Sequence, residues 1–413
     1  MTYRSEIYLG LDEEIDPTNY IIATFRLPEK VNLQDRALEL AAESSIGTWT
    51  EVHTLSPEII ENMAAKIIDI QDSGLIQIAY PLALFEDGNI PQLLSDVAGN
   101  VFGMKTLDHL RLMDLAIPEA YAKTFPGPAF GIDGIRKAIN AEANRPIVGT
   151  IIKPKLGLDS ERHAQVAYEA WSGGLDFVKD DENLSNQTFN RFDSRITLTL
   201  EKADLVYEET GRKVLYAANI TAPADVMLER AEYVKAQGGL CIMMDVFTAG
   251  FSAVQYIRNQ NLGLIIHAHR AMHGAFTRQK DHGITNLAFA KLLRLAGVDL
   301  LHTGTVVGKM EGDRTEVLEL GRFLQGPFYG QKPVFPAASG GLHPGLLPAL
   351  VDLYGVDVAC MFGGGVHGHK WGSRKGAQAV RQAVDAVVQK IPLEKYAETH
   401  PELQMALELW GQS

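Results

Sequence analysis

The chain has 413 residues, of which 46% are hydrophobic and 22% charged; this is too long for one small domain and suits a barrel with one further domain. The formal net charge of −13, with no basic block, disfavours nucleic acid and anionic membranes as partners. Cys241 and Cys360 lie in apolar runs, and with no signal pattern and no membrane-length run they indicate a cytoplasmic protein.

Residues 1–126 mix short strand and helix signals and predict a separate α+β domain. The segments 20–27 and 75–82 are apolar enough for strands, and residues 32–45 carry apolar side chains at helical spacing. The proline-glycine-proline segment at 126–128 interrupts this pattern. We therefore place a domain boundary after residue 126.

From residue 127 to 413 the pattern is regular, with short apolar runs that each precede a helical stretch. The runs cover residues 147–154, 175–182, 214–221, 240–248, 262–270, 299–305, 333–341 and 358–366. Eight such β-then-α units predict an α/β fold, a (β/α)8 TIM barrel that forms the C-terminal catalytic domain.

Nearly every run carries its unusual residues at its C-terminal end. These residues are Lys153, Lys179, Asp181, Glu182, Asn219, Asp245, His269, Arg270, His302, Ser339 and the glycines from Gly363. In a barrel those ends converge on one mouth, where active sites lie. The sequence therefore predicts a single active site at that end.

Lysine and three acids close the second run, from Lys179 to Glu182. An arbitrary motif of this kind is more often a salt bridge or an acidic helix turn than a metal site. At a barrel strand end, however, three acids exceed what one lysine needs for pairing. Mg2+ takes oxygen ligands, and a lysine that reacted with CO2 would become one.

The stretch GGLDFVKDDEN, residues 173–183, closely resembles the activation motif of ribulose-bisphosphate carboxylase large subunits. The resemblance implies that Lys179 is carbamylated and binds Mg2+ together with Asp181 and Glu182. It also implies a large-subunit-only enzyme of the archaeal or form II-like kind. Its N-terminal α+β domain would be ferredoxin-like.

Two further strand ends resemble the same family. In GTIIKPKLGL the two lysines at i and i+2 would point the same way on a strand. The resemblance implies that Lys153 protonates the product and Lys155 assists enolisation. The three histidines of HAHRAMH fit no usual zinc spacing. By resemblance His269 transfers protons and Arg270 binds a phosphate.

The glycine-rich segments after the last three strands complete the resemblance. HTGTVVGKMEG contains His302 and, near the tip of a closing loop, Lys309, which would hold the incoming CO2. SGGLHPG and FGGGVHGHKWG would bind sugar and phosphate, the first through Ser339, Gly340 and Gly341 and the second through Gly363 and Gly364. The fourth run reads MMDVFTAG, from which we derive no catalytic role.

The N-terminal domain also resembles the family, through ESSIGTWT and GNVFGMK. The matching residues are Glu43, Thr48, Trp49 and Asn100, and by resemblance they reach the active site of the neighbouring subunit. We therefore expect a homodimer or an assembly of dimers, without a small subunit. The implied reactants are ribulose 1,5-bisphosphate with CO2 or O2.

Two other interpretations remain. A carboxylase-like enolase that acts on a diketo sugar phosphate, as in methionine salvage, would keep the metal motif but change the loop lysine and several N-terminal site residues. A non-catalytic sugar-phosphate-binding barrel would have no need for Lys153, His269 and Lys309 together with the metal motif. The retained residues favour the carboxylase.

Overall fold

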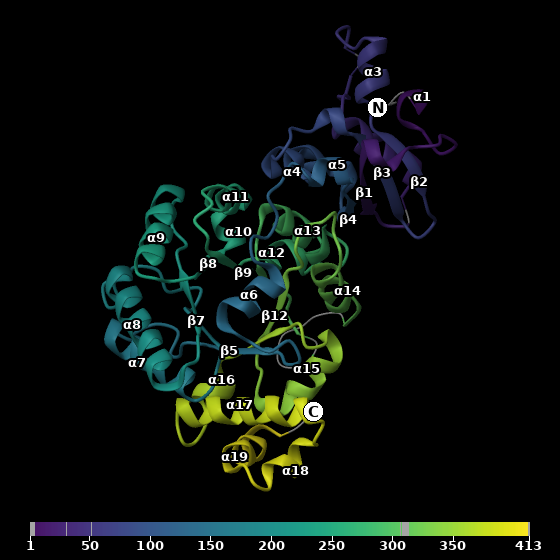
Figure 1. Ribbon diagram of the computed structural model, residues 1–413. Helices are drawn as coiled ribbons and strands as arrows, with labels where there is room; N and C mark the ends of the chain where they lie inside the picture. The colour runs from purple at the N-terminus through teal and green to yellow at the C-terminus, as the bar shows by residue number, and fades with distance from the viewer. Residues whose placement is uncertain (1–4, 30, 51, 306, 308–313, 412–413) are drawn as a thin grey trace. The chain divides into compact units, whose positions relative to one another are not determined.

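The computed structural model describes residues 5–29, 31–50, 52–305, 307 and 314–411, in two compact units (Figure 1). The first unit contains the chain up to Pro126 together with Met272–Ala296. The second contains Gly127–Ala271 and the chain from Gly297. The boundary expected after residue 126 does not anticipate the return of 272–296 to the first unit, and the domain division at that residue remains a prediction.

The first unit is built on a five-stranded sheet in the order β10-β4-β1-β3-β2. The strands are β1 (Tyr20–Arg26), β2 (Lys66–Ile70), β3 (Leu75–Pro81), β4 (Arg111–Ala116) and β10 (Gly283–Ile284). The central strand β1 pairs antiparallel with β3 and β4, and β10 pairs parallel with β4. The order 4-1-3-2, with helices after the first and third strands, is the ferredoxin-like arrangement.

Some helices of the first unit begin where the sequence supplies a side-chain cap. Asn32 caps α2 (Leu33–Glu43) by accepting the N–H of Asp35 at 3.3 Å, which satisfies one of the free donors of the first turn. The strands expected at 20–27 and 75–82 and the helix at 32–45 are confirmed. The other helices are α1 (Ser5–Tyr8), α3 (Pro57–Met63), α4 (Ile90–Ala98), α5 (Glu119–Ala122), α12 (Gly274–Thr277) and α13 (Asn286–Ala296), with 3-10 turns η1 (Pro17–Asn19), η2 (Leu82–Leu84), η3 (Asn100–Gly103) and η4 (Lys105–Leu107).

The second unit is a closed barrel of eight parallel strands, as the sequence predicts. The strands are β5 (Ile147–Ile151), β6 (Phe177–Lys179), β7 (Leu215–Asn219), β8 (Cys241–Asp245), β9 (Ile265–His269), β11 (Leu300–His302), β12 (Phe335–Ser339) and β13 (Ala359–Phe362). Each expected run contains one of these strands. The pairing of β13 with β5 closes the ring.

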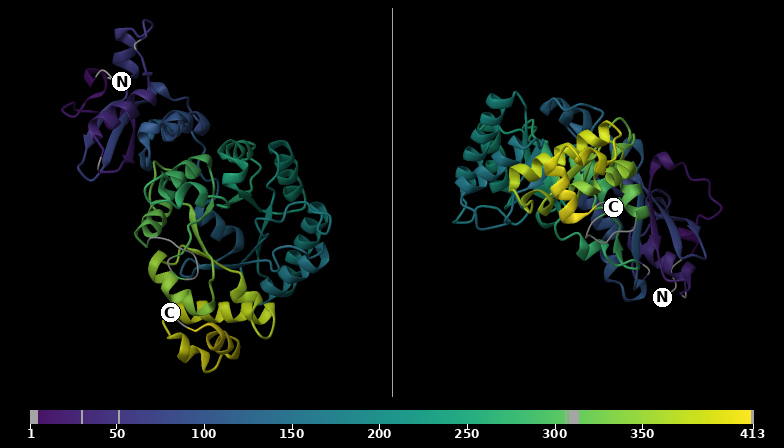
Figure 2. Two further views of the ribbon diagram at one scale, coloured as in Figure 1. Left: turned by 180° about the vertical axis from the view of Figure 1, so that it is seen from behind. Right: turned by 90° about the horizontal axis from the view of Figure 1, so that it is seen from below.

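Helices follow the strands around the barrel (Figure 2). They are α7 (Ser160–Ser172), α8 (Phe192–Thr210), α9 (Ala224–Ala236), α10 (Val246–Ala249), α11 (Phe251–Asn259), α14 (Arg314–Gln325), α15 (Leu347–Tyr354), α16 (Gly364–His367) and α17 (Ser373–Val388), with the 3-10 turn η5 (Pro344–Leu346). The terminal helices α18 (Leu393–Ala397) and α19 (Pro401–Trp410) pack beside α17. None of the helices described combines the length and apolar character that a membrane crossing requires.

One end of the barrel is filled by apolar side chains. Helix α6 (Gly131–Ile139) presents Ile132, Ile135 and Ile139 to a buried cluster that includes the first residue of every barrel strand. Such burial is worth roughly 1.5–3 kcal/mol for each isoleucine. The N-terminal end of the barrel is therefore packed core, and the polar side chains lie at the C-terminal ends of the strands.

Candidate active site

Lysines from two neighbouring strand ends meet one pair of carboxylates. Lys179 ends β6, and Asp181 and Glu182 follow it directly. Lys153, two residues beyond β5, donates to Asp181 Oδ2 at 2.8 Å. Lys179 Nζ lies 3.7 Å from Glu182 Oε2. The structure thus brings together four of the residues that the sequence assigns to catalysis and metal binding.

The amine of Lys179 is held in an unusual environment. Its side chain is 1% exposed, and Nζ donates to the carbonyl of Asp180 at 2.8 Å and approaches Met243 Sδ at 3.3 Å. Burial lowers the pKa of this amine, and nearby carboxylates, Glu182 first, only partly oppose that shift. Only the neutral form of an amine can react with CO2, so this environment favours such chemistry.

The remaining acid of the motif, Asp180, is occupied by a buried network. Its Oδ1 accepts from the hydroxyl of Tyr216 at 2.6 Å and lies 3.0 Å from His163 Nε2. Its Oδ2 accepts from Arg195 Nε at 3.2 Å and from the N–H of Asn219 at 2.9 Å. Burial raises the pKa of the carboxyl, but these partners outweigh it and hold the pKa well below its usual range. Asp180 therefore has no free oxygen for a metal.

Hydrogen bonds fix the turn that carries Asp181, which is buried, and Glu182, which is half-buried. Asp181 Oδ1 accepts from both the backbone and the side-chain nitrogen of Asn183, at 3.2 and 2.9 Å. Asn219 at the end of β7 donates to the carbonyls of Glu182 and Leu184 at 3.1 and 3.0 Å. Burial raises the pKa of Asp181, yet the bonds from Lys153 and Asn183 prevail and lower it. The carboxylate is therefore ionised and suited to a hard cation.

No complete metal site is preformed in the described part of the chain, where no three histidine, cysteine or acidic side chains form a metal-binding cluster. The carboxylates of Asp181 and Glu182 are hard oxygen donors beside the buried amine of Lys179. Each carboxylate oxygen has more than one lone pair, so the bonds to Asp181 leave room for a cation. These residues fit Mg2+ once Lys179 carries an oxygen donor of its own.

Asp245 is a site residue for which no catalytic role was predicted from the sequence. It ends β8, and its Oδ1 lies 3.0 Å from His269 Nδ1. Burial raises the pKa of Asp245 to about 7; the Lys179 charge opposes the shift and Glu182 adds to it. His269 Nε2 in turn lies 3.7 Å from Glu182 Oε2. The available signal was its position, since Asp245 is the last residue of its strand like Lys179 and His269.

His302 and Ser339 form a second polar group at the ends of β11 and β12. His302 Nδ1 lies 2.8 Å from Ser339 Oγ, and His302 Nε2 lies 2.7 Å from Nε2 of His267. The ring of His302 is also 4.6 Å from that of His269. The structure therefore brings two predicted substrate-binding residues together, and it adds His267, for which the sequence predicts no role.

Arg270 follows β9 and adjoins the turn after β11. Burial lowers the pKa of its guanidinium to about 10, and Tyr354 opposes the shift, so Arg270 remains charged. Gly304 has a φ of +80°, and a Cβ there would also overlap Arg270 Nη2. The positive φ therefore favours glycine at position 304, and a side chain there would displace the end of Arg270. A cation at this strand end fits the predicted phosphate contact.

Lys155 differs from its expected geometry. Strand β5 ends at Ile151, so Lys153 and Lys155 lie in the following segment, where strand alternation does not apply. Lys153 is half-buried against Asp181, whereas Lys155 is exposed. Its role in enolisation stays a prediction.

Glycines form the backbone at the ends of the last two strands. Gly340 and Gly341 have φ values of +109° and +76°, which favour glycine. Among the described residues, none approaches the place of a Cβ on Gly364 within 4 Å, and the nearest atom to a Cβ on Gly363, apart from its chain neighbours, is Lys153 Cε at 3.5 Å. An anion could thus approach these N–H groups closely.

The position of this glycine segment is fixed by Thr150 on β5. Its hydroxyl donates to the carbonyl of Phe362 at 2.5 Å and lies 2.9 Å from His367 Nε2. A hydroxyl has one hydrogen, so His367 Nε2 is the donor in the second contact. Burial lowers the pKa of His367 to about 4, and the Lys153 charge adds to the shift, so this imidazole is neutral.

The site residues expected in the first unit lie on and after α2 and at η3. Asn100 Nδ2 donates to Glu43 Oε1 at 3.2 Å, so these two are neighbours. Thr48 is half-buried, and Trp49 is 69% exposed. Their contribution to an active site remains a prediction. Lys309, the expected loop lysine, lies outside the described residues.

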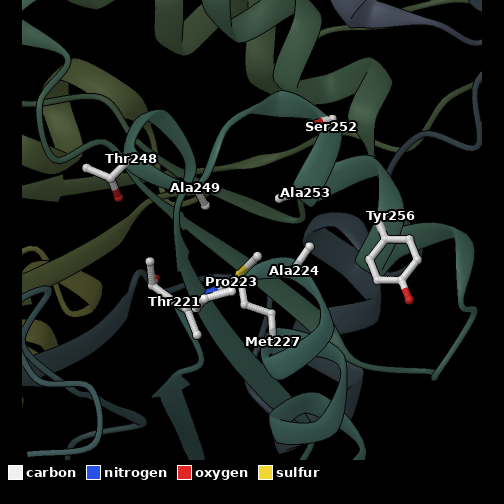
Figure 3. A pocket seen from close by; sticks show the side chains of 10 residues that line it. Thr221, Pro223, Ala224, Met227, Thr248, Ala249, Ser252, Ala253 and Tyr256 are labelled. Atoms are coloured by element: carbon white, nitrogen blue, oxygen red, sulfur yellow. The ribbon is translucent and has the colours of Figure 1, made fainter.

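A groove of about 640 Å³ opens between the connections that follow β7 and β8 (Figure 3). Its lining includes Thr221, Met227, Thr248 and Tyr256, together with small apolar side chains, and none of the lining residues is charged. A phosphorylated ligand needs cationic or N–H partners. The groove is therefore less suited to such a ligand than the cluster around Lys153 and Lys179.

Two family models together match most of the chain. The catalytic domain of the ribulose bisphosphate carboxylase large chain matches residues 131–410, and the N-terminal domain of that chain matches residues 10–121. The chain belongs to this family. The ribulose bisphosphate carboxylase of Methanocaldococcus jannaschii is 48% identical over 92% of this chain and 94% of its own length, and that of Pyrococcus abyssi is 47% identical over 98% and 96%.

Solved structures of the same family share the fold of this chain. An octameric Rubisco from Pyrococcus horikoshii, crystallised with sulfate, matches with a TM-score of 0.94 at 45% identity over 100% of this chain and 99% of its own. A dimeric archaeal Rubisco from Hyperthermus butylicus matches with a TM-score of 0.91 at 41% identity over 98% and 99%. The expected ribulose-bisphosphate carboxylase fold, a TIM barrel with a separate N-terminal domain, is therefore confirmed.

Proposed function

We propose that this chain catalyses the carboxylation of ribulose 1,5-bisphosphate to two molecules of 3-phosphoglycerate, with O2 as a competing substrate. The observation that carries the proposal is the buried amine of Lys179 beside Glu182, on a barrel whose other strand ends supply acids, histidines and cations. Family membership over nearly the whole chain supports the same reaction.

The proposed base is a carbamate on Lys179. Its neutral amine would attack CO2 and release one proton to water, which places an oxygen anion beside Asp181 and Glu182. These three groups would hold Mg2+, which when bound supplies positive charge to stabilise an enediolate. The carbamate oxygen would then remove the proton from C3 of the substrate.

The other roles follow from the positions of the cations and histidines. Lys153, half-buried at the mouth, would protonate the product carbanion, and Lys155 would assist enolisation. His269, oriented by Asp245, would move protons to and from the substrate hydroxyls. Arg270 would bind one phosphate, and Gly363 and Gly364 the other. Lys309 would hold the CO2 that adds to C2.

The same proposal includes a homodimer or an assembly of dimers in the cytoplasm, without a small subunit. The dimeric and octameric relatives support such an assembly. Trp49 adds a local reason, because a large aromatic side chain that is 69% exposed on one subunit is typical of a surface that a partner covers. The two buried free cysteines, Cys241 and Cys360, fit a reducing compartment.

The test is incorporation of radiolabelled bicarbonate into acid-stable product with ribulose 1,5-bisphosphate and Mg2+. We expect activity only after preincubation with CO2 and Mg2+, because Lys179 must first be carbamylated. Lys179→Ala should lower the rate by at least a thousandfold, since an essential base is removed. Full activity of that variant without chemical rescue would contradict the proposed base.

The same protein is also assayed with a diketo sugar phosphate, the substrate of the enolase alternative. If the protein enolises that compound but incorporates no labelled bicarbonate with ribulose bisphosphate, it is the carboxylase-like enolase and not a carboxylase. Binding of both compounds without turnover would instead support a non-catalytic barrel.

A further inference from the structure

His267 is buried on β9, two residues before His269, the last residue of that strand. It is 0% exposed, and its Nε2 lies 2.7 Å from Nε2 of His302. Among the residues that the structure describes, none offers a hydrogen-bond partner to His267 Nδ1, which is fully buried. His302 Nδ1 lies 2.8 Å from Ser339 Oγ, so three side chains from β9, β11 and β12 form one chain of hydrogen bonds.

Only two arrangements of the imidazole protons are compatible with these hydrogen bonds. Burial lowers the pKa of both imidazoles well below the usual value, so each ring is neutral and carries one N–H. If His302 donated to His267, the N–H of His267 would sit on Nδ1, where it would be a buried donor without a partner. If His267 donates, Nδ1 is a bare nitrogen, and buried acceptors are left unpaired more often than buried N–H groups.

The second arrangement, in which His267 is the donor, also determines which atoms of His302 and Ser339 donate and accept. His267 Nε2–H donates to His302 Nε2, so the proton of His302 must lie on Nδ1, and it donates to Ser339 Oγ. A hydroxyl that accepts in this way keeps its own hydrogen for another partner. Ser339 is a half-buried residue at the mouth, where that hydrogen can reach a ligand oxygen.

We propose that His267 is a positioning residue that fixes the Nδ1–H tautomer of His302 and thereby makes Ser339 a hydrogen-bond donor to the substrate. The inference rests on the proposed function for the identity of the substrate, a sugar phosphate. It adds the direction of the hydrogen bond between Ser339 and the substrate. Ser339 would donate to an acceptor oxygen, such as an ionised hydroxyl, a carbonyl or a phosphate oxygen.

The first measurement reads the tautomer directly in the whole protein. Magic-angle-spinning NMR of protein labelled with 15N-histidine distinguishes Nδ1–H from Nε2–H, and the signal of His302 is assigned by its loss in His302→Gln. We expect His302 in the Nδ1–H form in the wild type. An Nε2–H form would overturn the proposal, and this result does not depend on which substrate the enzyme uses.

The second measurement uses two variants of His267. His267→Phe removes the donor, and we expect KM for ribulose bisphosphate to rise about tenfold, the effect of one hydrogen bond to a charged acceptor. His267→Gln keeps an N–H donor and should recover most of that loss. Equal KM values for the two variants would overturn the positioning role, because a merely structural residue would not discriminate between them in this way.

A double substitution completes the test. In a Ser339→Ala background His267→Phe should change KM by less than twofold, because the hydroxyl through which His267 acts is already absent. Additive effects would overturn the proposal. Absence of turnover in the wild type would reject the proposed function but would leave the NMR result to decide the tautomer.

Discussion

The adjacent carboxylates of Asp180 and Asp181 have different environments, and we infer that they have different roles. Asp180 is 0% exposed and contacts Arg195, His163 and Tyr216, whereas the neighbouring Asp181 accepts from Lys153, whose side chain is 29% exposed. Removal of Asp180 would leave the buried guanidinium of Arg195 without its counter-charge. Removal of Asp181 would leave a lysine that water can still reach.

Asp180→Asn should therefore destabilise the fold by roughly 3–5 kcal/mol, the cost of breaking a buried ion pair. Asp181→Asn, the matched control one residue away, should cost about 1 kcal/mol or less, as expected for a partly exposed pair. Chemical denaturation at neutral pH measures both. Equal losses in the two variants would show that the network around Asp180 is not a major source of stability.

The contribution of Asp180 to stability should also depend on pH. Because the folded-state pKa of Asp180 is lowered, its contribution to stability is present above the unfolded-state value of about 3.9 and is lost as the pH falls below that value. The free energy of unfolding of Asp180→Asn should therefore depend less steeply on pH in the acid range than that of the wild type.

The site residues at the strand ends could be predicted where a single segment of sequence contains the motif. Lys179, Asp181 and Glu182 are consecutive or nearly so, and Lys153 lies next to the last residue of the neighbouring run. The pairs of Asp245 with His269 and of His267 with His302 join different strands. No local pattern contains such pairs, because they exist only after the barrel closes.

At the scale of elements, the barrel strands were predictable because each is a continuous apolar run between helices. Strand β10 was not, since two residues are too few to show any alternation. Its pairing with β4 draws the segment 272–296 into the first unit, where Lys291 also contacts Asp114 and the carbonyl of Leu115. Long-range pairing of so short a strand depends on these tertiary contacts.

Close packing of α17 on α16 gives an element-scale prediction. A Cβ on Gly376 would overlap the carbonyl of Val366, which is backbone and cannot move aside. Gly376→Ala should destabilise the protein by roughly 1–3 kcal/mol, although alanine favours a helix by about 1 kcal/mol over glycine.

Gly274→Ala is the control for this prediction, because among the described residues no atom outside its own helix and chain neighbours lies within 4 Å of the Cβ it would add. Thermal or denaturant unfolding compares the two variants. Unchanged or increased stability of Gly376→Ala would show that α16 and α17 can separate without cost. Since Gly363 and Gly364 begin the α16 segment, an increase in KM for the phosphorylated substrate should accompany the loss of stability.

At the scale of the whole molecule, a net charge of −13 must be reconciled with an anionic substrate. The cations that follow the barrel strands, Lys153, Lys155 and Arg270, supply local positive charge at one mouth. The acids around Lys179 would be offset by the metal. Binding of ribulose bisphosphate should therefore depend on these local charges more than on the overall field.

Shared active sites would make the dimer the smallest functional unit. Glu43 is bonded to Asn100 in the first unit, and Lys179 lies in the barrel of the second. Glu43→Gln, which retains a carbonyl acceptor for Asn100, and Lys179→Ala should each be nearly inactive alone. If the site combines Glu43 of one subunit with Lys179 of another, a mixed dimer holds one site in which both residues are intact.

Mixing the two variants should then restore activity, up to about a quarter of the wild-type value under random exchange of two-fold dimers. Half of the dimers are mixed, and one of the two sites in each is intact. Mass spectrometry of one isotopically labelled variant must establish that subunits have exchanged. Demonstrated exchange without any recovery would contradict the shared site, because Glu43 would then act on the barrel of its own chain.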